Sequence, residues 1–228
     1  MVGCEIYNMD NENMSLEQKQ IKLFIDLAVR IFINYHNYKK ISEPICWDTA
    51  PEFFRFFNEL LINDFFLQVS KIMDNEYFVG DKSKRNLTVQ LIINMPIWNN
   101  EQKRKLNEYN QKMRTLTTKS FRNARNMLIA HNSLSVYTND SIDSLGAFEK
   151  GLDETFISTL EEFCNYIHEQ VFGEIWGDFS PVVSGDIDEL IGYLKRGKVF
   201  HMVIEDDLIN LETKMLLMQK LQKTEECV

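Results

Sequence analysis

Apolar residues recur every three to four positions over long stretches of the chain, a spacing that is typical of amphipathic α-helices. The first stretch, residues 15–38, begins with Ser15 and Gln18 in a capping-box arrangement. The second stretch, residues 49–73, begins with a similar arrangement headed by Thr49. Because its apolar residues cover more than one stripe of the helix surface, we expect this second helix to be heavily buried.

Further along the chain, the pattern predicts a polar connector (residues 74–85) and a short helix capped by Asn86. A longer helix begins at about Asn99, and a loop rich in Ser, Asn, Asp and Gly separates it from a helix capped by Asp153. Two more helices are predicted at the end of the chain, residues 186–196, which stop at Gly197, and residues 199–221.

Composition supports the same fold class. The chain has only nine Gly and four Pro in 228 residues, too few for the frequent turns of a β-sandwich or β-barrel, and 44% of its residues are apolar. We therefore predict an all-α protein with a loose N-terminal leader (residues 1–14), a helical bundle (residues 15–177) and a helical C-terminal extension (residues 178–228) packed on the bundle or on a dimer.

Charge is distributed unevenly along the sequence. The whole chain has a net charge of −9, which argues against a broad nucleic-acid surface, since phosphate binding needs dense Lys and Arg. Between Lys103 and Arg125, however, eight Lys or Arg are opposed by a single Glu. Such a segment is either an ordinary solvated helix face or a basic strip that attracts a polyanion to one place on an acidic protein.

The basic segment ends in the stretch Ser120-Phe-Arg-Asn-Ala-Arg-Asn-Met-Leu-Ile-Ala-His131. On a helix, Arg125 and His131 lie about 120° apart around the axis. They share a cleft only if the long Arg side chain reaches around, if the helix ends at His131, or if a second copy brings them together across a dimer axis. Two interpretations stay open: His131 is either a catalytic group or a core or interface histidine that continues an apolar stripe.

Several classes of protein and site are disfavoured by the sequence. The Cys residues form no CxxC pair, no other ligand spacing indicates a metal site, and neither a Gly-rich phosphate loop nor a G-x-S-x-G motif occurs. No apolar run reaches the ~18 residues of a membrane span, and the N-terminus lacks the basic and apolar regions of a secretory signal. We expect a cytoplasmic, reduced protein that uses no metal, cofactor or membrane.

Two parts of the sequence resemble a known family. Arg125-Asn126-x4-His131 is similar to the R-x4–6-H motif of HEPN domains (higher eukaryotes and prokaryotes nucleotide-binding). Upstream, Phe65-Phe-Leu-Gln-Val-Ser-Lys-Ile-Met-Asp74, a polar loop and Asn86-Leu-Thr-Val-Gln-Leu-Ile resemble the AbiU-like branch, which is associated with phage abortive infection. The resemblance covers roughly residues 20–175.

The resemblance implies an up-and-down helical bundle that forms a homodimer, with the two motifs facing each other across the axis. Active members of the family are metal-independent endoribonucleases, so RNA is the implied substrate. By resemblance, Arg125 binds the scissile phosphate and Asn126 orients the phosphate or the motif. His131 acts as general acid or base at the ribose 2′-OH, which leaves a 2′,3′-cyclic phosphate.

Other basic residues of the segment are expected to hold the RNA: Arg114, Lys119 and Arg122. A phage-defence or toxin context, with an antitoxin or another defence-system protein as a further partner, follows from the resemblance alone. Ser133 stands where toxins paired with a nucleotidyltransferase often carry Tyr, which argues against regulation by tyrosine modification. The alternative is a catalytically inactive HEPN-like dimer that serves as a binding or interaction module, so the sequence leaves enzyme activity undecided.

Overall fold

The computed structural model describes residues 14–78, 80–117, 151–176, 186–205 and 210–216. These residues are mostly helical, as the all-α prediction states, and they include one small antiparallel hairpin. The chain divides into two compact units, residues 1–38 with 59–181 and residues 39–58 with 182–228. The second unit therefore takes a segment from early in the chain as well as the C-terminal helices.

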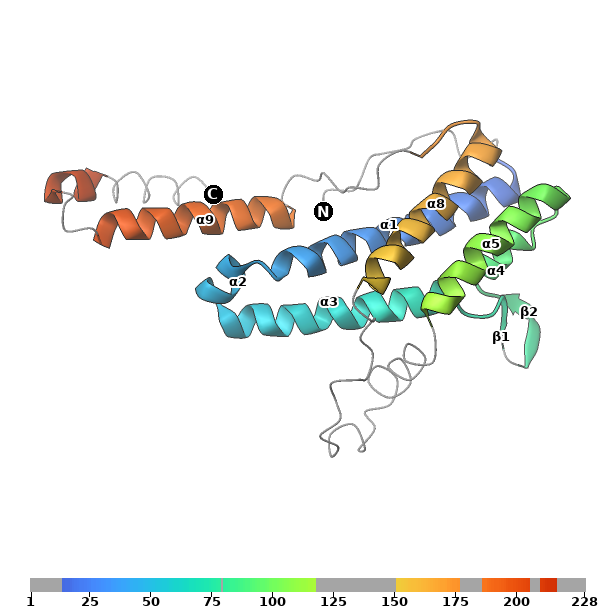
Figure 1. Cartoon of the computed structure of the whole chain (residues 1–228), viewed down its shortest axis with the longest axis horizontal. Coiled ribbons are helices and arrows are strands. Elements are labelled where there is room, and N and C mark those ends of the chain that lie inside the picture. The colour runs from blue at the N-terminus through green and yellow to red at the C-terminus, as the bar shows by residue number, and fades with distance from the viewer. Residues whose placement is uncertain (1–13, 79, 118–150, 177–185, 206–209, 217–228) are drawn as a thin grey trace, which may run out of the picture. The chain divides into compact units, whose positions relative to one another are not determined.

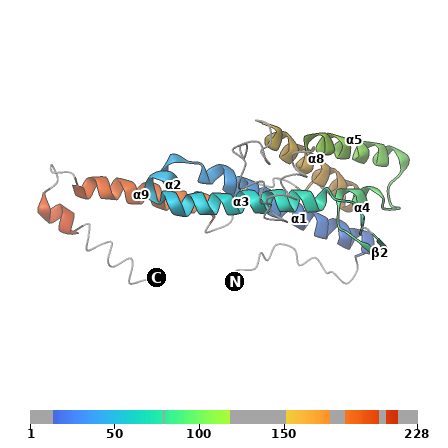
Figure 2. The ribbon, with the colours of Figure 1, turned by 90° about the horizontal axis from the view of Figure 1, so that it is seen from below.

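The first unit contains most of the helices (Figure 1). Its elements are α1 (Leu16–Ile41), α3 (Pro51–Ile72), β1 (Tyr77–Phe78), β2 (Asp81–Arg85), α4 (Val89–Ile93), α5 (Asn100–Leu116) and α8 (Leu152–Phe172). The last residues of α1 and the first residues of α3 belong to the second unit. Helices α5 and α8 lie side by side in both views (Figure 1; Figure 2).

Two helices begin with the reciprocal hydrogen bonds of a capping box. At α1, the Ser15 amide donates to Gln18 Oε1 (2.9 Å) and the Gln18 amide donates to Ser15 Oγ (3.2 Å), which confirms the predicted pair. At α5, Asn99 and Gln102 make the same exchange, and each hydrogen bond is 2.9 Å long. Both helix starts are therefore set locally, because these side chains satisfy N–H groups that lack a partner within the helix.

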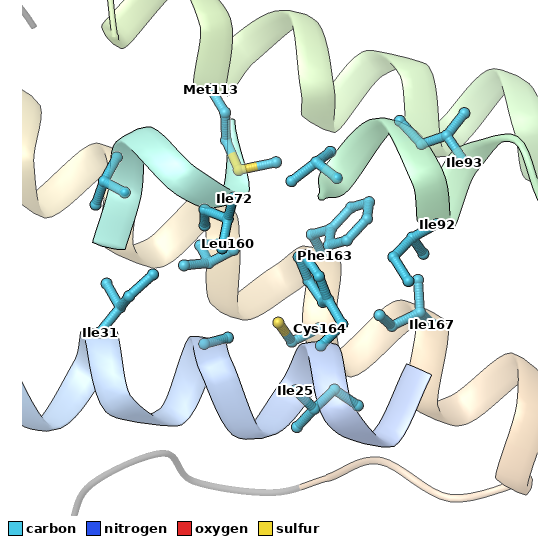
Figure 3. Close-up of a cluster of buried hydrophobic side chains, with 14 of the residues drawn as sticks. Ile25, Ile31, Ile72, Ile92, Ile93, Met113, Leu160, Phe163, Cys164 and Ile167 are labelled. Atoms are coloured by element: carbon cyan, nitrogen blue, oxygen red, sulfur yellow. The ribbon is translucent and has the colours of Figure 1, made fainter. Parts of the chain in front are cut away.

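An apolar cluster forms the core of the first unit, and all of its helices contribute to it (Figure 3). Phe24 of α1 and Phe163 of α8 are fully buried and meet edge to face, with ring centroids 5.7 Å apart. Ile72 reaches the cluster from α3, Ile92 from α4 and Met113 from α5. Burying such a side chain is worth roughly 1.5–3 kcal/mol, so this cluster is what holds α4 and α5 against α1 and α8.

The segment predicted to be a polar connector forms a hairpin instead. Strands β1 and β2 pair antiparallel, with Tyr77 opposite Arg85 and Phe78 opposite Asp81, and the register shifts between the two residues of β1. Gly80 has the positive φ (+86°) that glycine adopts without strain in such a turn. The prediction missed these strands because they are short and mostly polar, so no alternation of apolar and polar residues marks them.

The cap of α4 also differs from the prediction. The helix begins after Thr88, whose hydroxyl accepts a hydrogen bond from the Leu91 amide (3.2 Å). Asn86 instead closes the base of the hairpin, where its amide donates to the Glu76 carbonyl oxygen (2.6 Å) and its Nδ2 donates to the Asn75 carbonyl oxygen (3.0 Å). Thr88 and Asn86 are both residue types that cap helices. Thr88 is the cap because Asn86 makes its hydrogen bonds at the base of the hairpin.

Helix α8 begins after Gly151, which has a left-handed conformation (φ +87°), and not at Asp153 as predicted. Asp153 lies in the first turn and accepts a hydrogen bond from the hydroxyl of Tyr35 on α1 (3.0 Å). Burial and this neighbouring carboxylate both raise the pKa of Tyr35. Asp153, which the sequence predicts as the helix cap, therefore connects α8 to α1 through this hydrogen bond.

The second unit contains α2 (Pro44–Thr49), α9 (Ile187–Glu205) and a short helical stretch, residues 211–216. Helix α2 was not predicted, and Thr49, which the sequence places at the cap of the next helix, donates its hydroxyl to the Ile45 carbonyl oxygen within α2 (2.7 Å). Helix α9 continues past Gly197, so the predicted stop at this glycine is wrong.

Ion pairs connect α9 to the residues around α2. In each of three pairs the nitrogen and oxygen are 2.6–2.7 Å apart and both side chains are partly exposed: Lys40–Asp188, Lys195–Glu43 and Lys198–Asp48. Ile187 and Ile191 of α9 are buried, as are Ile45 and Cys46 of α2. This unit therefore combines a small apolar contact with surface charge pairs, and such pairs are individually worth only about 0–1 kcal/mol.

Candidate functional site

Helix α5 carries the part of the basic segment that the structure describes. Leu106 and Met113 are fully buried on one face of the helix, and Asn110, on the same face, is only 6% exposed. The basic side chains lie elsewhere on the helix and are exposed or partly exposed: Lys103, Arg104, Lys105, Lys112 and Arg114. Helix α5 is therefore amphipathic and has a cationic outer surface.

Two of these cations contact neighbouring side chains. Arg104 Nη1 lies 2.6 Å from Glu108 Oε1, one helical turn away. Lys105 Nζ lies 4.7 Å from the ring centroid of Tyr166 on α8, a cation–π contact. The Glu108 carboxylate neutralises the charge of Arg104, whereas the Tyr166 ring holds the Lys105 ammonium beside α8 without neutralising it.

Arg114 is the predicted RNA-binding residue that falls within the described part of the chain. It is partly exposed in the last turn of α5, and its Nε donates to Asn110 Oδ1 at 3.1 Å. No described residue accepts a hydrogen bond from its Nη1 or Nη2. The guanidinium is therefore held at Nε, and its two Nη groups, which have no acceptor among the described residues, can together bind two oxygens of one phosphate.

Asn110 connects Arg114 to a series of hydrogen-bonded side chains. Asn110 Nδ2 donates to Gln90 Oε1 of α4, and the two atoms are 3.4 Å apart. Gln90 Nε2 donates in turn to Oδ1 of Asn94, the residue that ends α4, at 3.1 Å. Three amide side chains thus follow one another from α5 to the end of α4.

Glu76 continues this series and is its carboxylate member. Its side chain is 4% exposed, Oε2 accepts from Asn94 Nδ2 (2.5 Å) and Oε1 accepts from Arg85 Nη2 (2.5 Å). Burial by itself would raise the pKa of Glu76, but the hydrogen bonds from Asn94 and Arg85 and the charge of Arg85 hold that pKa below its ordinary value. Glu76 is therefore ionised at neutral pH.

Arg85 forms the other end of the series, on β2. Its guanidinium carbon lies 5.8 Å from the ring centroid of Tyr77, and its side chain is 45% exposed. The two ends of the series are therefore arginines that reach the surface. Between them, Glu76 and Asn110 are buried, Gln90 is partly exposed and Asn94 is exposed. We call the six side chains the polar network: Arg85, Glu76, Asn94, Gln90, Asn110 and Arg114.

The other predicted site residues lie outside the described residues: Lys119, Arg122, Arg125, Asn126 and His131. Their mutual geometry and their distance from Arg114 are therefore not tested by the structure, and their roles stay predictions. Helix α5, which ends at Leu116, precedes them in the sequence.

No family model, no curated protein and no solved structure matches this chain. The HEPN resemblance therefore rests on the sequence motifs alone. The site has to be interpreted from its own residues, which are the cationic surface of α5, the polar network and the motif that follows them in the sequence.

Other titratable side chains in the described ranges do not form a second candidate site. Nowhere in those ranges do three or more His, Cys, Asp or Glu side chains gather in a way that could hold a metal ion. His168 is a core histidine, 5% exposed, with Nδ1 2.7 Å from the Glu174 carbonyl oxygen and its ring against Phe172 and Trp176. None of the described helices is both long and apolar enough to cross a lipid bilayer.

Sequence reasoning did not find the polar network. Its members are common polar residues, and they come from the hairpin, α4 and α5 at irregular intervals, so no spacing marks them. One signal was available: Asn110 falls on the apolar face of α5 together with Leu106 and Met113. A polar side chain at a buried position needs a hydrogen-bond partner, and Asn110 could have been singled out for that reason.

Proposed function

We propose that this protein is a metal-independent endoribonuclease of the HEPN type that acts as a homodimer. One observation carries the proposal: the cationic helix α5 leads, along the chain, into Arg125-Asn126-x4-His131. The order of the preceding elements also fits the resemblance, because α3 ends just before Asp74, a polar hairpin follows and α4 is a short helix. A toxin or phage-defence role belongs to the same proposal and rests on the resemblance.

In the proposed reaction, the ribose 2′-OH attacks the adjacent phosphorus and the 5′-oxygen leaves. The products are a 2′,3′-cyclic phosphate and a 5′-hydroxyl end. His131 takes the proton from the 2′-OH or gives one to the departing oxygen, since imidazole titrates near neutral pH. Arg125 stabilises the charge that develops on the phosphate, Asn126 orients the group, and the cations of α5 bind neighbouring phosphates.

The test is cleavage of a mixed-sequence single-stranded RNA in excess EDTA. We expect the wild type to leave 2′,3′-cyclic phosphate ends, and Arg125→Ala and His131→Ala to lose about 100-fold or more in rate. His201→Ala and Arg196→Ala, at exposed positions of α9, are matched controls that should cleave like the wild type. Circular dichroism and thermal unfolding establish that each variant is folded.

Cleavage that survives in folded His131→Ala, or that disappears in EDTA, would refute the proposal. A wild type that cleaves no RNA would favour the second candidate function, a catalytically inactive helical dimer that binds a partner. The net charge of −9 favours this candidate, because RNA-binding proteins are usually basic. It predicts that His131→Ala alters dimerisation or stability, which analytical ultracentrifugation and thermal unfolding would show.

A further inference from the structure

We propose that the polar network positions Arg114 as a phosphate-binding arm for single-stranded RNA, and that Asn110 is the residue that holds this arm in place. The inference rests on the proposed RNA-binding function and extends it to residues that no motif marks. It makes Arg114 a direct contact to the RNA backbone and makes Asn110, Gln90 and Asn94 positioning residues.

The direction of the hydrogen bonds explains why Asn110 presents an oxygen to Arg114. The ionised Glu76 carboxylate can only accept hydrogen bonds, so Asn94 turns its Nδ2 toward it. This leaves Asn94 Oδ1 facing Gln90 Nε2, and Gln90 Oε1 facing Asn110 Nδ2. Asn110 Oδ1 is then the atom that remains for Arg114 Nε. The buried carboxylate thus sets the orientation of all three amides.

This arrangement fixes the guanidinium without using the groups that bind phosphate. An arginine that is free in solvent loses rotamer freedom when it binds a ligand, and that loss weakens binding. Arg114 is already held by the 3.1 Å hydrogen bond at its Nε, whereas its Nη1 and Nη2 have no acceptor among the described residues. With Nε occupied by Asn110, the two Nη groups remain to contact two phosphate oxygens together.

Arg114 also differs from Arg104 and Arg85 in that no described carboxylate pairs with it. Arg104, on the same helix, is paired with the Glu108 carboxylate, and Arg85 is paired with Glu76. Asn110 is a neutral amide, so it holds Arg114 without compensating its charge. Among these three arginines, Arg114 is therefore the one prepared for a phosphate, and it also lies closest in sequence to Arg125.

The test measures RNA binding in a His131→Ala background, so that the RNA stays intact. A fluorescein-labelled 12-nucleotide RNA of mixed sequence is titrated, and its anisotropy is followed at several salt concentrations. Adding Arg114→Ala should raise Kd about tenfold and reduce the slope of log Kd against log salt by about 0.7, the value for one lost phosphate contact on a single strand. Arg196→Ala, the matched control at an exposed position of α9 outside the proposed site, should change Kd less than twofold.

The positioning role is tested by a double-mutant cycle. Asn110→Leu should raise Kd about threefold while leaving the salt slope unchanged, because the charge of Arg114 is still present. In an Arg114→Ala background, Asn110→Leu should not raise Kd further, since the Arg114 guanidinium that Asn110 positions is absent. Gln90→Met, at a partly exposed position, removes the partner of Asn110 and gives a second variant with the same expectation if Asn110→Leu fails to fold.

Three outcomes would overturn the inference: no RNA binding at all, an Arg114→Ala variant whose Kd stays within twofold of the background, or an Asn110→Leu effect of equal size with and without Arg114. The cleavage assay separates this inference from the proposed function. RNA binding that depends on Arg114 in a protein that cleaves no RNA would refute the nuclease and support the phosphate-binding role of Arg114. Normal cleavage with RNA binding that does not depend on Arg114 would support the nuclease and refute the role of Arg114.

Discussion

Replacing Glu76 with Gln should destabilise the first unit, because the carboxylate accepts hydrogen bonds from two directions. Asn94 Nδ2 donates to one of its oxygens and Arg85 Nη2 donates to the other. A Gln side chain has the same size but carries an NH2 group in place of one oxygen. In either orientation this NH2 faces a donor, at a position where the native side chain is only 4% exposed.

The cost of Glu76→Gln can be worked out from these contacts. A hydrogen bond that involves a charged group contributes roughly 1.5–3 kcal/mol. The variant weakens the bond from Arg85 and loses one of the two acceptors, but water can solvate the Arg85 guanidinium because that side chain is 45% exposed. We therefore expect a loss of about 2–3 kcal/mol in the free energy of unfolding, which lowers Tm by roughly 5–10 °C.

Asp81→Asn is the matched control on the same hairpin. Asp81 pairs with Lys84 at 3.3 Å, but the two side chains are 41% and 70% exposed. Water screens a pair of this kind, so the control should unfold close to the wild type. Urea unfolding followed by circular dichroism measures all three proteins. Equal stability of Glu76→Gln and Asp81→Asn would refute the argument that burial gives Glu76 its importance.

The same reasoning predicts how the effect depends on pH. Hydrogen bonds and the charge of Arg85 lower the pKa of Glu76 in the folded state, against about 4.3 in the unfolded chain. Its stabilising contribution is therefore complete above pH 4.3 and is lost as the pH falls through the lower, folded value. The Gln side chain of Glu76→Gln does not titrate, so the difference in free energy of unfolding between this variant and the wild type should shrink in acid. A difference that is the same at pH 7 and at a pH below the folded pKa of Glu76 would contradict this.

Two further predictions concern single positions in α8 and α9. Gly197 lies inside α9, where a new Cβ meets no atom, so Gly197→Ala should stabilise the protein by about 0.5–1 kcal/mol. Gly173 follows α8 with a φ of +80°, which an alanine adopts only with strain, so Gly173→Ala should destabilise the protein by about 1 kcal/mol. Urea midpoints that shift in the same direction would refute this reading of the two glycines. Cys164 is fully buried and burial raises its pKa, so its thiol should resist maleimide in the folded protein and react with it in urea. Mass spectrometry measures the labelling. Rapid labelling of the folded protein would contradict the buried position of Cys164.

The burial of α1 and α8 was predictable from the sequence because it follows the helical period. The heavy burial predicted for α3 is wrong, since Phe53, Phe56 and Leu60 are 47–60% exposed. Phe24 and Phe163 lie on apolar stripes of this kind, and both are fully buried in the core. The Ser15 cap was predictable for a similar reason, since its partner lies only three residues away. Features that depend on neighbours in sequence could thus be inferred without a structure.

Features that depend on distant neighbours could not be inferred in this way. Asn86 and Thr88 are equally plausible helix caps, and the contact of Asn86 with the carbonyl oxygen of Asn75 decides the choice. Asn110 and Gln90 are twenty positions apart and meet only because α4 packs against α5. The polar network is therefore a product of tertiary packing, while the Arg125–His131 motif was found by spacing and lies outside the described residues.

The three ion pairs between α9 and the residues around α2 make the second unit sensitive to dissolved salt. Electrostatic attraction between exposed charges reaches about 10 Å at 0.1 M salt and only about 3 Å at 1 M. The apolar cluster around Phe24 and Phe163 does not depend on such attraction, so salt weakens the two units unequally. At molar salt the second unit should lose part of its stability, because each pair contributes only about 0–1 kcal/mol and the apolar contact remains, while the first unit keeps its own. Ionic strength would then change, within one chain, how stable one unit is relative to the other.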